Sequence, residues 1–131
     1  MMRDLIAAID LGSNSFRLQV GRIVNDQIYP LDGLKEAVRL AAGLSPDKKL
    51  DLASQQRGVA ALQRFQERLR DFPVGRVRAV ATNTLRVAKN AEEFLIRAEA
   101  ALGIPIEVIA GREEARLIYV GVAHTLPDPH K

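Results

Sequence analysis

The strongest indication of the fold lies near the start of the chain, in Leu5-Ile6-Ala7-Ala8-Ile9-Asp10-Leu11-Gly12-Ser13-Asn14-Ser15-Phe16-Arg17-Leu18. Residues 5–9 form a short apolar run closed by Asp10, which predicts a buried strand. The small and polar residues 12–15 predict a tight turn. Apolar and polar residues then alternate over residues 16–21, the pattern of a strand with one buried face. Two strands joined by a short turn therefore open the chain.

A third extended segment follows this pair of strands. Asn25 and Asp26 supply a turn, and the extended segment covers residues 27–40. It contains Pro30 and Gly33, which predict an irregular strand or one at the edge of the sheet, because proline has no N–H to donate to a neighbouring strand. We therefore expect a three-stranded antiparallel start.

Helices and strands alternate over the rest of the chain. Apolar residues recur at spacings of three and four over residues 59–72, which predicts an amphipathic helix that Pro73 ends. Residues 77–81 and 106–109 predict two buried strands. Because helices connect these later strands, we expect them to run parallel. The predicted fold class is α/β, with a mixed five-stranded sheet and helices packed on it.

Two further helix boundaries can be read from the residues around the last predicted strand. Asn90 is placed to cap a helix, with Glu93 at the capping-box position and Gly103 just past the helix end. Gly111 then opens a final helix.

Composition excludes several classes of site. The chain has 131 residues, a net charge of +3, no cysteine and only two histidines, so it holds neither a thiolate zinc site nor a cluster of several imidazoles. No window approaches the roughly 20 apolar residues of a membrane span, so we expect a cytoplasmic protein without a membrane partner. Aromatic residues make up 5%, which argues against single-stranded nucleic acid as a ligand.

The first candidate site is the turn that follows the first strand. A phosphate group needs backbone N–H groups that it can approach closely, and Gly12, Ser13, Asn14 and Ser15 offer them together with hydroxyl donors. The carboxylate of Asp10 can hold Mg²⁺, and Arg17 can close on the same anion. The alternative is an ordinary hairpin turn with local hydrogen bonds. Neither a P-loop nor a dinucleotide-binding motif is present.

Two further candidates each follow a predicted strand. Thr82 and Arg86 lie where open α/β sheets bind ligands, and they suit phosphate; the alternative is a helix cap with a solvated arginine. Glu114 lies three residues after Gly111, where a carboxylate can either cap the helix or orient a water molecule for attack. The sequence alone does not show which of these two roles Glu114 has.

In order, residues 8–18, 81–90 and 107–119 resemble the exopolyphosphatase/guanosine pentaphosphate phosphohydrolase (Ppx/GppA) family. The resemblance implies an actin-like ATPase (ribonuclease-H-like) fold in two lobes, with inorganic polyphosphate or guanosine pentaphosphate bound between them. It implies that Arg17 and Arg86 counter the charge of the terminal phosphoryl groups, that Glu114 activates water, and that Mg²⁺ lies near Asp10. We expect the full-length protein to be a homodimer.

The resemblance also implies a division of the chain. Residues 1–124 correspond to an N-terminal Ppx/GppA lobe, and residues 125–131 to the start of a linker to a second lobe that is absent. We expect this piece alone to hydrolyse little or nothing. Two other interpretations are a stand-alone polyphosphate- or nucleotide-binding module and a lobe related to sugar or acetate kinases.

Overall fold

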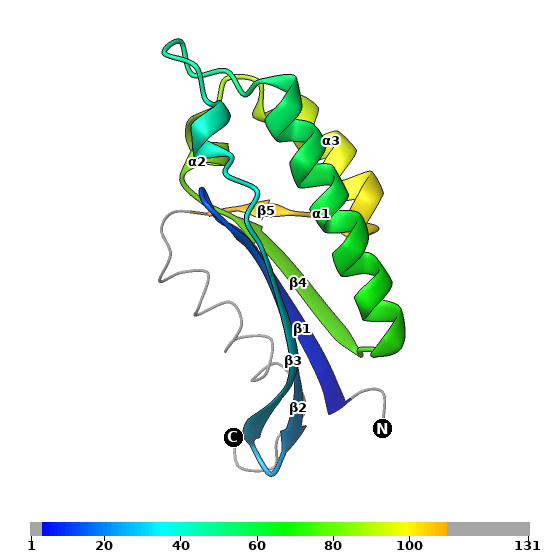
Figure 1. Cartoon of the computed structure of the whole chain (residues 1–131). Helices are drawn as coiled ribbons and strands as arrows, with labels where there is room; N and C mark the ends of the chain where they lie inside the picture. Colours follow the sequence, from blue (N-terminus) through cyan, green and yellow to red (C-terminus); the bar gives the residue numbers. More distant parts are fainter. Residues whose placement is uncertain (1–3, 110–131) are drawn as a thin grey trace.

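The computed structural model describes residues 4–109, which form one five-stranded sheet with two long helices against one of its faces (Figure 1). The strands lie in the order β3-β2-β1-β4-β5. Their bounds are β1 Leu5–Leu11, β2 Phe16–Val24, β3 Gln27–Glu36, β4 Arg76–Ala81 and β5 Glu107–Val108. The long helices are α1 Leu52–Asp71 and α3 Ala91–Leu102, and the short helices are η2 Ala41–Gly43 and α2 Thr84–Val87. The predicted α/β class with a mixed five-stranded sheet is confirmed.

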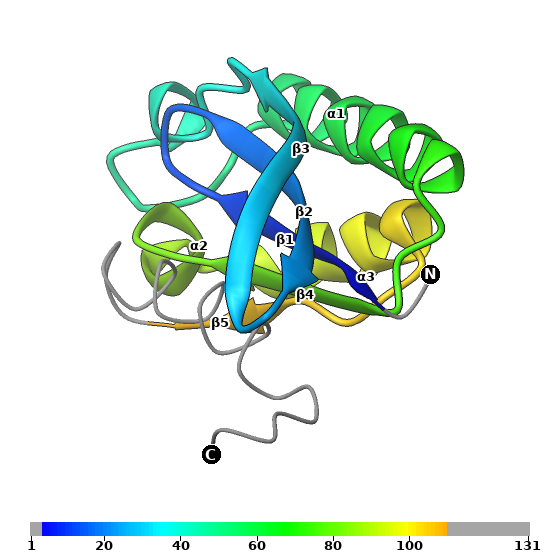
Figure 2. The same cartoon turned by 90° about the horizontal axis from the view of Figure 1, so that it is seen from below.

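The first three strands form the predicted antiparallel meander. Asp10 pairs with Arg17 between β1 and β2, and Arg17 pairs with Lys35 between β2 and β3. The register shifts beside Val20, and the ribbon formed by β2 and β3 twists strongly relative to the other strands (Figure 2). β3 lies at the edge of the sheet, as its proline predicts, but it ends at Glu36, before residue 40.

One apolar core lies between the sheet and the two long helices. Phe16 of β2, Phe65 of α1 and Phe94 of α3 are fully buried there. The helices approach closely at Gly58, where an added Cβ would lie 2.9 Å from the ring of Phe94. Because alternate residues of a strand face opposite sides, the other face of the sheet carries residues such as Arg17 that lie outside this core.

Helix α1 begins seven residues before the predicted apolar stripe. Its N-cap is Asp51, whose carboxylate accepts a hydrogen bond of 2.7 Å from the amide of Ser54. The first two turns carry mainly polar residues, so the periodicity of apolar residues does not reveal them. The helix ends at Asp71, close to the predicted stop.

Asn90 is the N-cap of α3, as predicted, but its side chain does not make the predicted capping-box hydrogen bond. The Asn90 side chain makes no hydrogen bond to its own helix; instead it bonds to the backbone N–H and C=O of Leu50, at 2.8 and 3.0 Å. This pairing across 40 residues satisfies both ends of the amide group. The other end of α3 follows the prediction, since Gly103 has a φ of 86° and donates to Glu99.

The later strands are parallel, as expected. β4 pairs with β1 on one side and with β5 on the other. β5 contains two residues rather than four, and both are exposed, so the prediction of a buried strand over residues 106–109 is wrong for them. Among the described residues, no helix is long and apolar enough to cross a membrane. The final helix predicted from Gly111 lies outside the described residues.

Candidate functional site

The loop of residues 12–15, between β1 and β2, is held by its carbonyl groups. Three carbonyl oxygens accept backbone hydrogen bonds: that of Ser15 from Gly12 (3.1 Å), that of Ser13 from Ala41 (3.0 Å) and that of Asn14 from Arg39 (2.9 Å). The C=O and N–H of one planar trans peptide point in opposite directions. Since the Ser13 and Asn14 carbonyls face the 39–41 segment, the N–H groups of Asn14 and Ser15 face away from it. These two amides donate no backbone hydrogen bond to a residue in the range 4–109. They are available to an anion.

Gly12 is required by the close approach of the chain to itself. An added Cβ at this position would lie 2.9 Å from the carbonyl oxygen of Ser15. That oxygen is the one bonded by the Gly12 amide, so it cannot move away without breaking the turn. The glycine expected from the sequence to bring backbone near a phosphate therefore also shapes the loop.

The second predicted stretch meets the first. At the end of β4, the Thr82 amide bonds to the Leu11 carbonyl at 3.3 Å. Two residues further on, the Thr84 hydroxyl donates to the Ser13 hydroxyl at 2.8 Å. This bond leaves the Ser13 hydroxyl able to donate its own hydrogen to a ligand. Thr82 is the threonine predicted from the sequence, whereas Thr84, which was not predicted, makes the side-chain contact; nothing in the sequence distinguishes the two.

Asn83 lies between these threonines and has a φ of 46°, a backbone conformation that residues other than glycine rarely adopt. It precedes α2, which carries Arg86 on its exposed surface. The chain therefore turns sharply out of β4, and the start of α2 lies against the loop through the contact between Thr84 and Ser13, two residues before Arg86.

The 38–43 segment that holds the loop is itself held by α1. Nε of Arg57 donates to the Val38 carbonyl at 2.9 Å, and the same guanidinium bonds the Ser54 hydroxyl at 3.0 Å. Gly43 packs so tightly on the helix that an added Cβ would lie 1.7 Å from the Ser54 hydroxyl. Arg39 has a φ of 56° in this segment and is exposed. The Ser54 hydroxyl and amide also hold the pKa of Asp51 below its usual value.

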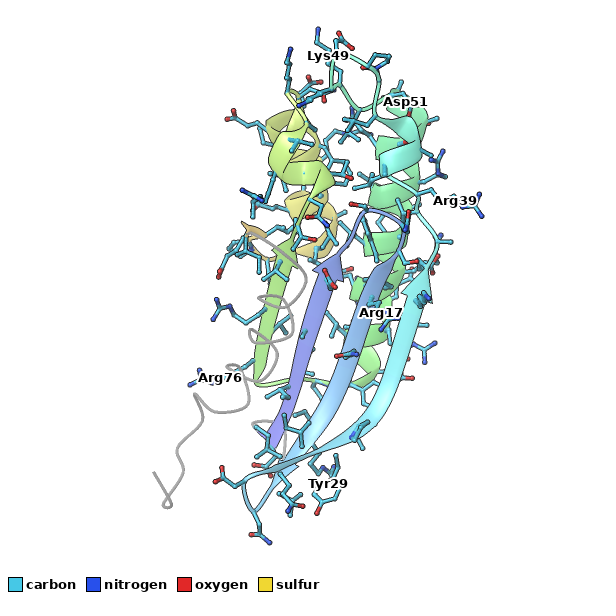
Figure 3. All side chains as sticks on the ribbon, turned by 90° about the vertical axis from the view of Figure 1, so that its left-hand side faces the viewer. Arg17, Tyr29, Arg39, Lys49, Asp51 and Arg76 are labelled. Atoms are coloured by element: carbon cyan, nitrogen blue, oxygen red, sulfur yellow. The ribbon has the colours of Figure 1, made fainter. Side chains whose placement is uncertain are left out.

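The arginines near the loop differ from those elsewhere. Arg64, Arg68 and Arg78 each form an ion pair with a carboxylate, and the Arg64 pair holds the pKa of Glu36 below its usual value. Within residues 4–109, the guanidinium groups of Arg17, Arg39 and Arg86 make no such pair. Figure 3 shows Arg17 on the face of the sheet that is turned away from the long helices. Exposed cations that form no ion pair among the described residues are able to bind an anionic ligand.

Asp10 is the acidic residue next to the loop. It pairs in register with Arg17 of β2, so both side chains lie on the same face of the sheet. The part of the chain that the structure describes contains no group of three or more His, Asp or Glu side chains that could hold a metal ion by themselves. One carboxylate and nearby hydroxyl groups are hard oxygen donors, which suit Mg²⁺ when the substrate phosphates supply further oxygens.

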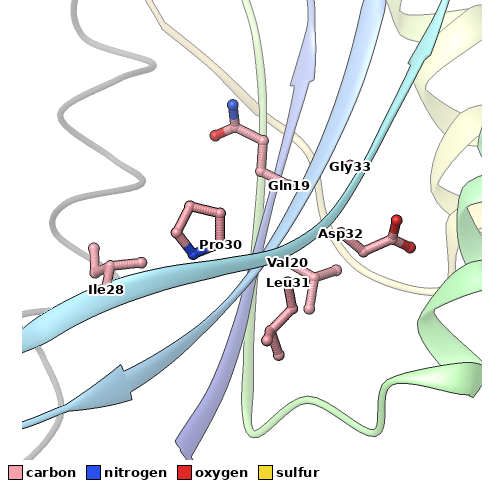
Figure 4. A pocket seen from close by; sticks show the side chains of 7 residues that line it. All are labelled: Gln19, Val20, Ile28, Pro30, Leu31, Asp32 and Gly33. Atoms are coloured by element: carbon pink, nitrogen blue, oxygen red, sulfur yellow. The ribbon is translucent and has the colours of Figure 1, made fainter.

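Two remaining features bear on the site. Glu114 lies outside the described residues, so its position relative to the loop stays a prediction. A pocket lined by seven residues of β2 and β3 lies beside the register shift (Figure 4). None of the loop residues 12–15 lines that pocket. It is therefore separate from the candidate site.

Comparisons with known proteins agree with this geometry. The model of the Ppx/GppA phosphatase family matches residues 19–131. A crystal structure of the Aquifex aeolicus Ppx/GppA family member is 33% identical, with a TM-score of 0.81 over 93% of this chain and 40% of that one. An exopolyphosphatase from Cytophaga hutchinsonii is 32% identical, with a TM-score of 0.80 over 88% of this chain and 37% of that one. The chain thus spans about two fifths of the length of these structures.

A more distant likeness concerns the fold alone. Nucleoside triphosphate hydrolases from Neospora caninum are represented by a structure that is 17% identical, with a TM-score of 0.53. The actin-like ATPase fold expected from the sequence is confirmed.

Proposed function

Because the chain belongs to the Ppx/GppA phosphatase family, we propose that it is the N-terminal lobe of a phosphoanhydride hydrolase that releases terminal phosphate from inorganic polyphosphate or guanosine pentaphosphate. One observation carries the proposal. The carbonyls of Ser13 and Asn14 are bonded to the 39–41 segment, which directs the amides of Asn14 and Ser15 the opposite way. This arrangement suits a terminal phosphoryl group.

Each residue has a proposed role in this reaction. The amides of Asn14 and Ser15 and the Ser13 hydroxyl bind the terminal phosphoryl group, Gly12 shapes the loop that presents them, and Arg17 and Arg86 offset the charge of the phosphoryl group. Glu114 accepts a proton from the attacking water. Asp10 would hold Mg²⁺, which when bound neutralises charge on the phosphate oxygens. Thr84 orients the Ser13 hydroxyl through their hydrogen bond.

The length of the chain, compared with the structures that it matches, bears on the activity expected of the 131 residues alone. The structures that it matches are about two and a half times as long. We propose that the substrate lies between residues 1–124 and a second lobe, and that the whole protein is a dimer. Without a second lobe the ligand faces water, where each ionic contact is weak. The 131-residue chain should therefore bind phosphate weakly and hydrolyse little.

Binding is tested by titrating the ¹⁵N-labelled chain with inorganic phosphate and following its amide resonances. The Asn14 and Ser15 amides should shift together and saturate. Gly12→Ala should abolish these shifts, because the added Cβ forces the Ser15 carbonyl out of place. Gly33→Ala is the matched control, since its Cβ would make only an ordinary contact at 3.5 Å. Shifts spread evenly over all the basic residues, with none at the loop, would contradict the proposal.

Catalysis is tested in a chimaera that joins residues 1–131 to the C-terminal part of the Aquifex aeolicus relative. Glu114→Gln in this chimaera should lower the rate of phosphate release from polyphosphate by at least about 100-fold, as expected for loss of a general base. Binding of polyphosphate should be retained. Equal melting temperatures of the two chimaeras establish that the variant is folded. Full turnover in the variant, or loss of stability without loss of turnover per folded molecule, would leave Glu114 as a helix cap only.

A further inference from the structure

A row of charged residues crosses the sheet beside the loop of residues 12–15. Lys35 of β3, Arg17 of β2 and Asp10 of β1 occupy one register line, with Arg17 paired to both neighbours. Residues directly opposite each other on antiparallel strands put their side chains on one face, with Cβ atoms about 5 Å apart. Arg17 is the second residue after the loop, so the two cations lie at the loop end of the sheet.

Lys35 and Arg17 form a like-charge pair on this register line, and the carboxylate on the line, Asp10, is paired with Arg17 and not with Lys35. Both side chains are exposed, and neither makes an ion pair with a residue in the range 4–109. Like charges directly opposite on a sheet are destabilising. Nothing in the core requires a cation at Lys35, which is outside the apolar cluster. Asp10 faces Arg17 from β1, whereas Lys35 has only the like-charged Arg17 opposite it, so Lys35 is the cation of this row with no carboxylate paired to it in register.

The acidic residues of β3 form ion pairs with arginines of α1. Glu36 bonds Arg64 of α1 through both carboxylate oxygens, at 2.7 and 2.8 Å. Asp32 bonds Arg68 of the same helix at 2.9 Å. Since alternate residues of a strand face opposite sides, these carboxylates lie on the helix side, whereas Lys35 lies on the side of Arg17. The strand thus separates its paired acids from its unpaired cation.

We propose that Lys35, together with Arg17, binds a second phosphate group adjacent to the one held by the loop, so that Lys35 determines a preference for a phosphate chain over a single phosphate. This inference rests on the proposed phosphate-binding function. Arg17 follows the loop by two residues and is paired in register with Lys35, so its guanidinium is placed to contact both phosphates. The Lys35 ammonium reaches only the second.

The test compares inorganic phosphate with inorganic tripolyphosphate as ligands of the 131-residue chain, using the Asn14 and Ser15 amides as reporters. Lys35→Gln should weaken tripolyphosphate binding about threefold, as expected for one exposed ionic contact, and leave phosphate binding unchanged. Lys49→Gln is the control: it removes the same charge from an exposed turn well separated from Arg17 (Figure 3), and should leave both affinities unchanged. The melting temperature of Lys35→Gln should be unchanged or slightly higher, because a repulsive pair is removed.

The outcomes separate the two proposals. Equal tripolyphosphate affinity in the wild type and Lys35→Gln, with loop amides still responding, would overturn the role of Lys35 and leave the phosphate site standing. The role of Lys35 is likewise overturned if Lys49→Gln weakens binding as much, or if Lys35→Gln weakens both ligands equally. If neither ligand shifts the loop amides of the folded wild-type chain, the proposed function fails, and the second subsite fails with it.

Discussion

Gly43→Ala tests most directly how the loop of residues 12–15 is supported. Gly43 is buried at the end of η2, against the first turn of α1. An added Cβ would lie 1.7 Å from the Ser54 hydroxyl, 2.6 Å from the Ser54 Cβ and 2.7 Å from a carboxylate oxygen of Asp51. Because Ser54 sits in a regular helix and Asp51 caps that helix, neither can move far without loss of the cap. The 38–43 segment must therefore shift away from α1.

The size of the effect follows from three contributions. Restricting the unfolded chain by Gly→Ala stabilises by about 0.4–1 kcal/mol. Overpacking a tight site costs about 1–3 kcal/mol. Shifting the 38–43 segment also disturbs the hydrogen bond from Arg57 to the Val38 carbonyl, for about 1 kcal/mol. The net expectation is a loss of about 2 kcal/mol in the free energy of unfolding, since the steric contribution exceeds the entropic one.

Urea unfolding followed by circular dichroism measures this loss, and the amide spectrum shows its location. The Asn14 and Ser15 resonances should move without ligand, because Arg39 and Ala41 hold the carbonyls of the loop. Gly33→Ala is the control, with an ordinary 3.5 Å contact at the added Cβ. A Gly43→Ala chain as stable as the wild type, with unmoved loop resonances, would refute the proposed bracing of the loop from α1.

Two further predictions concern the same end of the molecule. Asn90→Ala should lower the free energy of unfolding by about 2 kcal/mol in urea, since two hydrogen bonds to Leu50 are lost; an unchanged midpoint would show that these bonds are not formed. Acid should also weaken the fold through Asp51. The Ser54 hydroxyl and amide lower the pKa of this carboxyl in the folded state, so its stabilisation is present above the ordinary pKa of 3.8 and is lost as the pH falls below it. Asp51→Asn should flatten the dependence of stability on pH below 5, and an unaltered profile would exclude this carboxylate as a contributor.

Local patterns were sufficient for the fold. Alternation over β2, the apolar run of β1 and the proline of β3 are signals carried by neighbouring residues, so the meander and its edge strand could be predicted. The capping box at Asn90 was wrong for the opposite reason. An asparagine side chain bonds whichever backbone groups are near, and the competing partner, Leu50, is 40 residues away in sequence.

In the candidate site, too, some features could be predicted from neighbouring residues and others could not. The amino-acid pattern alone places Gly12, the hydroxyls beside it and Arg17 after a buried strand, because the residue types of a turn can be read directly along the chain. The contact of Ser13 with Thr84, and the hydrogen bonds from the 39–41 segment to the loop carbonyls, are found only in the folded molecule. Such contacts depend on the packing of α1, the strands and the connecting turns together, which no local pattern encodes.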